Sequence, residues 1–395
     1  MSKSLLCSAA SALLLLAGAP ALGESPIAQN FGTHAENGAV SVDYGVWSDI
    51  LRDIVLNVGP SDREPQTSRT GAVTGTLVST GNRTRYRFEG NRVVYHLMED
   101  EYRNAITAYR QELEALPAQL DWERMSANEQ LAYWLNLHNV AVIEQVMLNF
   151  PARRIDRLDA DGVDAPLFDA QILNVAGTPL SLNDIRKNIV YELWDDPRVM
   201  YGFFNGSIGG PNIRREAYTG AQVWNQLNSN AREFVNSLRG VDIPYRQQKV
   251  SSLYAEAAPY FPVLESDLRS HLLRFANEDT AEDLNQGRPL NPEIYEWGIA
   301  DLTNGSALCG GPNVQIDYGE GPPGRQASQA STTAGCSVLP QNARILMNHV
   351  LERRFELLQE GRLGDVRTID VPTDEDGNPI GTAPAPAPQS EEDGQ

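Results

Sequence analysis

The segment 127–149 constrains the fold most, because it carries the signals of a long helix together with an apolar face that must be buried. Ser126 followed by Glu129 is the pattern of a capping box, in which both side chains bond to the first turn of a helix. Pro151 stops the helix shortly after position 149. The apolar face consists of Leu131, Trp134, Leu135, Val142, Ile143 and Val146. The sequence therefore predicts a long helix that packs into the core.

The composition is that of a globular and strongly acidic protein. The chain has 395 residues, 41% of them hydrophobic, which is enough for a sizeable core and too much for a disordered chain. Its 32 Lys and Arg against 52 Asp and Glu give a net charge of −20. A nucleic-acid-binding protein needs a basic face, so no nucleic-acid partner is predicted. No internal stretch approaches the ~20 apolar residues of a membrane span.

Residues 1–23 have the pattern of a secretory signal peptide. A basic residue precedes an apolar run too short to span a membrane, and small residues at Ala21 and Gly23 suit signal peptidase. A lipoprotein signal that uses Cys7 is the alternative, but Cys7 lies inside the apolar run. The sequence therefore predicts a periplasmic or secreted protein that is cleaved near Gly23.

Cleavage would leave two cysteines, Cys309 and Cys336. In an oxidising compartment two cysteines are most simply a disulfide, here closing a loop rich in Gly, Pro, Ser and Thr. A cysteine nucleophile paired with a histidine is the functional alternative, although no histidine lies near either cysteine in the sequence. We expect the disulfide.

The remaining periodicity is mostly helical. Helical spacing of apolar residues predicts helices at 44–56, 97–116, 220–238, 265–276 and 342–359, and a further one after the cap residue Ser181. Alternating patterns predict hairpins at 74–88 and 172–180, and a short buried strand at 199–204.

The predicted fold class is α+β, a mostly helical single domain with a small sheet into which 199–204 inserts. A C-terminal extension clipped by the disulfide follows it. The predicted boundaries are a signal peptide at 1–23, a flexible leader at 24–39, the α+β domain at 40–276, the extension with the final helix at 277–364 and a disordered acidic Ala/Pro tail at 365–395.

Two motifs resemble those of the domain of unknown function 547 family. The family helix reads approximately E-x-L-A-[FY]-W-[IL]-N-x-[YH]-N-A, and residues 129–140 read EQLAYWLNLHNV. A second family motif begins D-P-R-V, as 196–199 does, and continues here to Tyr218. The resemblance covers roughly 40–275, and it implies more about the fold than about function, because the family has no settled activity.

The chain departs from the family pattern at three positions. Met200, Asn205 and Gly210 stand where the second family motif has one histidine and two cysteines. An analogy with papain-like or transglutaminase-like hydrolases would require a thiolate and an imidazole near this turn. The resemblance therefore implies a member without cysteine-based catalysis.

The helix motif supplies the first candidate site. Asn136 and Asn139 lie three residues apart and project near one side of the helix, with His138 on a neighbouring face. The two amides could orient a substrate or stabilise an oxyanion. The structural alternative is that they bond to neighbouring backbone groups and pin the downstream turn to the helix.

The glycine-rich turn at 205–211 supplies the second candidate. Its glycines could present several backbone N–H groups to an anion, with help from the Ser207 hydroxyl and the Arg214 guanidinium. The structural alternative is a tight exit from a strand, with Arg214 paired to a local acid such as Glu216.

The sequence thus favours a domain that binds a small anionic ligand or a protein partner in a cleft between the helix and the turn. The candidate cleft residues are Asn136, His138, Asn139, Asn205, Ser207 and Arg214. The alternative is a hydrolase or transferase with non-cysteine catalytic groups, such as Ser207 with His138. No cofactor or metal is predicted, because the chain has neither an H-E-x-x-H motif nor Cys/His zinc spacing.

Overall fold

The computed structural model describes residues 25–36, 38–63, 84–86, 89–244 and 247–301, and the backbone of 367–370. Several predictions lie outside these residues: the signal peptide, most of the hairpin at 74–88, the cysteines Cys309 and Cys336, the final helix at 342–359 and most of the acidic tail.

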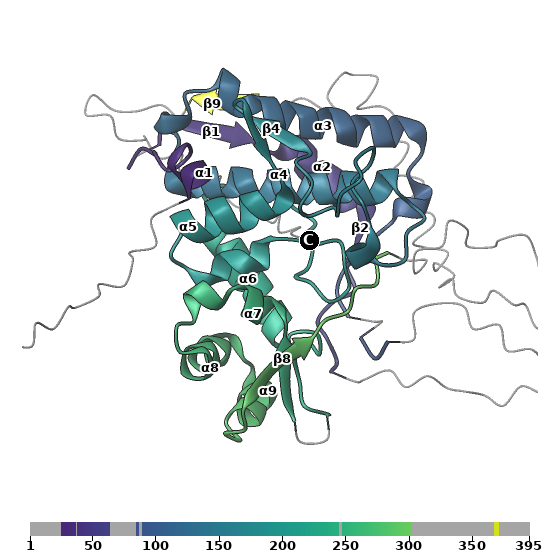
Figure 1. The fold of residues 1–395 in the computed structure, drawn as a ribbon, viewed down its shortest axis with the longest axis vertical. Coiled ribbons are helices and arrows are strands. Elements are labelled where there is room, and N and C mark those ends of the chain that lie inside the picture. Colours follow the sequence, from purple (N-terminus) through teal and green to yellow (C-terminus); the bar gives the residue numbers. More distant parts are fainter. Residues whose placement is uncertain are drawn as a thin grey trace, which may run out of the picture.

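Helices dominate the described chain (Figure 1). The α-helices are α1 (Pro26–Gln29), α2 (Gly45–Ile54), α3 (Asp100–Gln119), α4 (Ala127–Leu148), α5 (Tyr191–Leu193), α6 (Val223–Val235), α7 (Leu253–Glu256), α8 (Leu264–Phe275) and α9 (Glu278–Leu284). Wide helical turns at Asp184–Val190 lead directly into α5.

The strands are short and form small separate sheets. They are β1 (Val40–Asp43), β2 (Val55–Leu56), β3 (Arg92–Val93), β4 (Leu173–Val175), β5 (Thr178–Leu180), β6 (Val241–Asp242), β7 (Gln248–Ser251), β8 (Leu290–Ile294) and β9 (Arg367–Asp370). β1–β9, β2–β3 and β4–β5 are antiparallel pairs. In the three-stranded sheet, β6 is antiparallel to β7 and β8 is parallel to β7. The fold is an α+β domain, as predicted.

Helix α4 forms the centre of the core. Every residue from Glu129 to Met147 is buried, so the helix is covered on all sides. Helix α3 packs along it, as Figure 1 shows at the top of the molecule. The sequence predicted this helix and its buried apolar face, and the structure buries its polar residues along with the apolar ones.

The start of α4 confirms the predicted cap and changes its second half. The Glu129 N–H donates to the Ser126 hydroxyl at 3.2 Å. The Glu129 carboxylate instead accepts the N–H of Val42 at 3.0 Å, which ties β1 to α4. Burial raises the pKa of Glu129, although this backbone bond and another from Gly220 act to lower it.

A second hydrophobic cluster lies around α8 and the three-stranded sheet. It contains Met200 and Tyr201 together with apolar residues of α7 and α8. Helix α6 joins the two clusters, because its first half (Leu227) packs on the α4 core and its second half (Phe234) packs on α8. The face of α6 that is not needed for this packing is available for other contacts.

The strand predicted at 199–204 is wrong. Pro197–Gly202 is a 3₁₀ helix, which begins with a proline and is capped by the Asp196 carboxylate accepting the Arg198 N–H at 2.9 Å. A short apolar run fits a buried strand and a buried helical turn equally well, and here the cap and the proline decide.

Of two further predicted elements, the hairpin at 172–180 forms as predicted and the helix after Thr219 begins later than predicted. The hairpin at 172–180 is confirmed, with positive φ at Ala176 (50°) and Gly177 (82°) in its two-residue turn. The helix predicted to start after Thr219 begins later, at Val223, because Gln222 still bonds back to Thr219 in a turn.

Packing extends beyond both predicted edges of the domain. Within the predicted leader at 24–39, Ala28 and Phe31 are buried, the latter in the main core. Beyond the predicted boundary at 276, Ile299 is buried in the same core. Among the described residues, the folded domain therefore extends beyond both predicted boundaries.

Candidate functional site

Asn139 fixes the downstream turn to α4. Its side-chain nitrogen donates to the carbonyl of Gly202 at 2.9 Å, and its side-chain oxygen accepts the N–H of Phe204 at 2.9 Å. The side chain is 3% exposed. The helix and the turn thus meet as predicted, and both ends of the amide are bonded to the backbone, which supports the structural interpretation.

Asn136 makes the same kind of clamp one turn earlier. Its nitrogen donates to the carbonyl of Tyr218 at 2.8 Å, and its oxygen accepts the Tyr218 N–H at 2.9 Å. The two clamps hold both ends of the segment 202–218 on one face of α4. Neither amide is available to a substrate.

His138 is a buried neutral imidazole. Its Nδ1 lies 3.2 Å from the Asn139 side-chain oxygen, and that oxygen is an acceptor because it also takes the Phe204 N–H. Nδ1 therefore carries the proton. Burial, with a smaller effect of Arg186, lowers the pKa of His138 to about 3. The ring packs edge-on against Phe203 at 4.8 Å between centroids.

Ser207 and His138 do not form a catalytic pair among the described residues. The Ser207 N–H and hydroxyl both donate to the Asn205 side-chain oxygen, at 3.1 and 2.8 Å. The Asn205 nitrogen donates to the Tyr295 hydroxyl. Ser207 is 2% exposed, so its hydroxyl stabilises the turn rather than facing a cleft.

The backbone N–H groups of the glycine-rich turn bond within the chain, which supports the structural alternative for this turn. The N–H of Ile208 donates to the carbonyl of Gly298 at 2.8 Å, and that of Gly209 donates to the carbonyl of Glu296 at 2.9 Å. The chain itself therefore supplies the acceptors. A Cβ at Gly209 would lie 2.4 Å from the Glu296 nitrogen, so the glycine is needed for this close approach.

Arg214 differs from the other candidates because it lies at a cavity. Its Nη1 donates to the carbonyl of Gln226 at 3.3 Å and to the side-chain oxygen of Asn230 at 2.9 Å, rather than pairing with Glu216. Its Nη2 has no hydrogen-bond partner among the described residues. The guanidinium is thus held in place with one end unused.

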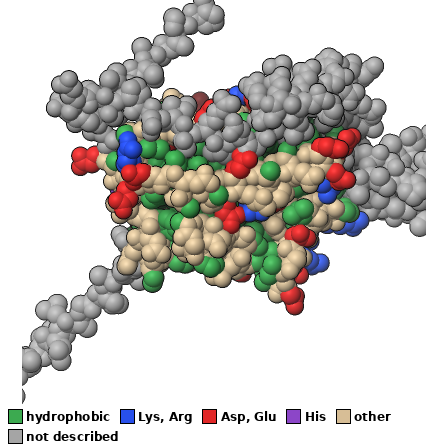
Figure 2. All heavy atoms as spheres, turned by 90° about the horizontal axis from the view of Figure 1, so that it is seen from above, with side chains coloured by type: hydrophobic (Ala, Val, Ile, Leu, Met, Phe, Trp, Pro, Cys, Tyr) green, Lys and Arg blue, Asp and Glu red, His purple; other side chains and the backbone are tan. Residues whose placement is uncertain are grey.

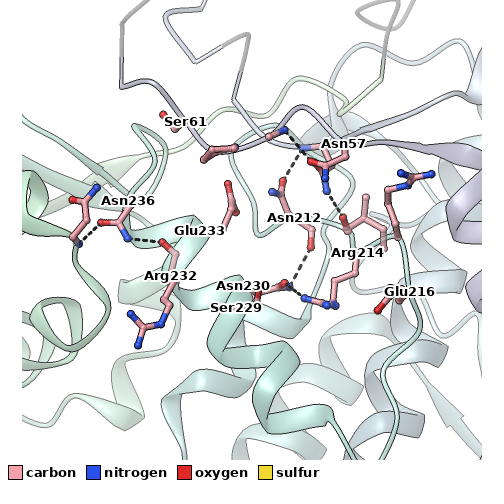
Figure 3. A pocket seen from close by; sticks show the side chains of 16 residues that line it. Asn57, Ser61, Asn212, Arg214, Glu216, Ser229, Asn230, Arg232, Glu233 and Asn236 are labelled. Atoms are coloured by element: carbon pink, nitrogen blue, oxygen red, sulfur yellow. Dashed lines mark hydrogen bonds between the residues drawn. The ribbon is translucent and has the colours of Figure 1, made fainter. Parts of the chain in front are cut away.

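The cavity is an open polar groove of about 610 Å³ (Figure 3). Its lining comes from five parts of the fold, namely the loop after β2, Asn91 just before β3, the segment 212–216, one face of α6 and the start of α9. The residues are Asn57, Gly59, Pro60, Ser61, Asn91, Asn212, Ile213, Arg214, Arg215, Glu216, Ser229, Asn230, Arg232, Glu233, Asn236 and Asn277. Six are asparagines, three are arginines and none is aromatic. Sequence reasoning found only Arg214, because these segments are far apart along the chain.

No group of three or more His, Cys, Asp or Glu residues that could hold a metal ion occurs in the part of the chain that the structure describes. In that same part, no helix is both long and apolar enough to cross a membrane.

The fold and the site define a helical α+β domain whose central helix clamps a second segment through two buried asparagines. Residues 122–235 match the model of a family described as "Protein of unknown function, DUF547", and this match, which spans both clamps, supports membership of the chain in the DUF547 family. No curated protein and no solved structure matches the chain.

Proposed function

We propose that this protein is a ligand-binding domain without cysteine-based catalysis, and that a small polar molecule occupies the groove beside α6. The observation that carries the proposal is the groove itself, whose volume of about 610 Å³ lies in the range of small-molecule sites. The described residues, which include the matched segment, contain no cysteine.

The groove is built as a rigid site. Asn230 holds Arg214 at 2.9 Å and is itself fixed by bonds from its nitrogen to the Tyr201 carbonyl (3.0 Å) and the Tyr218 hydroxyl (2.9 Å). Tyr218 is in turn clamped by Asn136. A chain of bonds therefore runs from α4 to the groove wall. A side chain fixed in this way loses little conformational entropy when it binds a ligand.

The position of the groove revises the predicted site. The sequence placed a cleft between α4 and the turn, where the side chains are buried against one another. The groove is lined instead by the segment 212–216 and one face of α6, together with the other segments seen in Figure 3. The motif that resembles the family therefore acts as the support of the proposed site.

A blocking substitution tests this proposal. Ser229 is exposed on the groove face of α6, and Ser229→Trp would fill the groove without removing a bond that holds its walls. In a thermal-shift screen of small polar compounds, a ligand at 100 times its Kd stabilises the protein by about 2.7 kcal/mol, and we expect a shift of several degrees. This shift should vanish in Ser229→Trp.

Ser270→Trp is the matched control, because Ser270 is an exposed serine on α8 away from the groove. Ligands of the groove should still stabilise this variant. If every stabilising compound acted equally on Ser229→Trp, the groove would not be the binding site.

We also propose export, on the strength of the signal-peptide pattern at 1–23, and a disulfide between Cys309 and Cys336. When the full chain is expressed in a bacterium, mass spectrometry of the periplasmic or secreted protein should show a mature N-terminus just after Gly23 and no free thiol. An uncleaved chain would contradict the export proposal, and two free thiols would contradict the disulfide.

A further inference from the structure

We propose that the ligand of the groove is a small molecule with two or more carboxylates. This inference rests on the proposed function and names the class of ligand. It follows from an inventory of the polar groups in the groove, which separates those already used by the chain from those left for a ligand.

Three asparagines of the groove share one pattern. In each, the side-chain oxygen accepts a backbone N–H, which fixes the orientation of the amide. The bonds are 2.9 Å from Gly59 to Asn57, 2.7 Å from Asn91 to Asn212 and 2.9 Å from Thr280 to Asn277. The side-chain nitrogens of these three asparagines have no hydrogen-bond partner within the described residues. Each therefore offers an N–H donor.

The other asparagines are used by the fold. The Asn91 nitrogen donates to the carbonyl of Ile213 at 2.9 Å, and the Asn236 nitrogen donates to that of Phe275 at 3.0 Å. Asn230 holds Arg214. These side chains form the wall of the groove. The groups that can bond to a ligand are therefore those that the fold does not use.

The charged groups add further donors. Arg214 keeps its Nη2 for a ligand, and Arg232 is exposed at the groove. The acids of the lining add few free acceptors. One oxygen of Glu233 accepts from the buried Arg239 at 2.5 Å, and its other oxygen is inaccessible. Glu216 is an exposed acid of the lining. The unused groups of the groove are thus mainly N–H donors, and they require a ligand rich in acceptors.

The spread of the donors favours several anionic groups over one. Asn57, Asn212 and Asn277 come from three different segments of the lining, so one phosphate cannot fill a groove of this volume. The absence of aromatic side chains in the lining gives no surface on which a nucleobase could stack.

The charge of the whole chain favours a small ligand over a polymer. At a net charge of −20 the protein repels a long polyanion, whereas a small molecule interacts mainly with its immediate surroundings. On the face seen in Figure 2 the acidic side chains are scattered among apolar and uncharged ones, so no basic surface extends there to guide a polymer.

The test uses isosteric substitutions. Asn212→Asp keeps the oxygen that accepts the Asn91 N–H and replaces the unused N–H donor with a negative oxygen. Isothermal titration calorimetry of the full chain with citrate should show saturable binding, and Asn212→Asp should weaken it at least tenfold through like-charge repulsion. Asn277→Asp should act in the same way while preserving the bond to Thr280.

Asn128→Asp is the matched control. It adds the same charge outside the groove and keeps the oxygen that accepts the Trp224 Nε1–H at 2.8 Å. Citrate affinity should change less than twofold in this variant. An equal loss in Asn128→Asp and Asn212→Asp would reflect net charge and would overturn the assignment.

Three further probes separate the two proposals, namely inorganic phosphate, erythritol and putrescine. Tighter binding of any of them than of citrate, lost in Ser229→Trp, would overturn the carboxylate class and leave the groove as the ligand site. Citrate binding that survives both Asn212→Asp and Ser229→Trp would place citrate elsewhere and overturn the class. The absence of citrate binding would also overturn the class, while the thermal-shift screen still decides whether the groove binds ligands.

Discussion

Asn139→Leu is expected to lower the free energy of unfolding by about 4 kcal/mol. Leucine branches at Cγ as asparagine does but cannot bond to the Gly202 carbonyl or to the Phe204 N–H, both of which the asparagine side chain satisfies at 2.9 Å. Each buried backbone group left without a partner costs about 1–3 kcal/mol. Urea unfolding followed by circular dichroism measures the difference.

The control for this prediction is Asn149→Leu at the end of the same helix. Asn149 is partly exposed, and its nitrogen donates one bond, to the carbonyl of Gln145 at 2.9 Å. Water can replace that partner, so a loss of about 1 kcal/mol or less is expected. A loss below 1 kcal/mol in Asn139→Leu would show that the clamp does not hold the turn.

The sequence offered the clamps as one of two interpretations of the helix amides, because their signals are local. Asn136 and Asn139 lie three residues apart on a helix that a cap and a proline delimit, and an amide on a helix that packs into the core must find buried partners. The structure supports the pinning of the downstream segment and adds the partner atoms, which no pattern in the helix could specify.

The sequence left open what the glycine-rich turn approaches, because the partners of this turn are distant in the sequence. The acceptors of the Ile208 and Gly209 N–H groups are the carbonyls of Gly298 and Glu296, some ninety residues later in a segment of weak periodicity. Glycines indicate a close approach but not whether another chain segment or an anion makes it. The sequence did not predict the groove for the same reason, since five separate segments line it.

Lowering the pH is expected to lower the free energy of unfolding strongly, because His138 is buried in the folded protein. In the unfolded chain a histidine takes up a proton near pH 6.5, whereas in the folded protein burial lowers the pKa of His138 to about 3. Between these values the unfolded state binds the proton and the folded state does not. The contribution of His138 to stability is therefore complete above pH 6.5 and is lost as the pH falls toward 3.

The loss can be isolated by comparing the wild type with His138→Phe, which keeps an aromatic ring against Phe203. From pH 7 to pH 4 the wild type should lose about 3 kcal/mol more than the variant, by urea unfolding at each pH. Buried acids such as Glu129, whose pKa is raised, change stability in the opposite direction but do so equally in both proteins. His34→Phe, which removes an exposed imidazole, is the surface control. Parallel pH profiles for the wild type and His138→Phe would mean that the imidazole takes up a proton equally in the folded and unfolded protein, and the assignment of His138 as a buried neutral imidazole would be wrong.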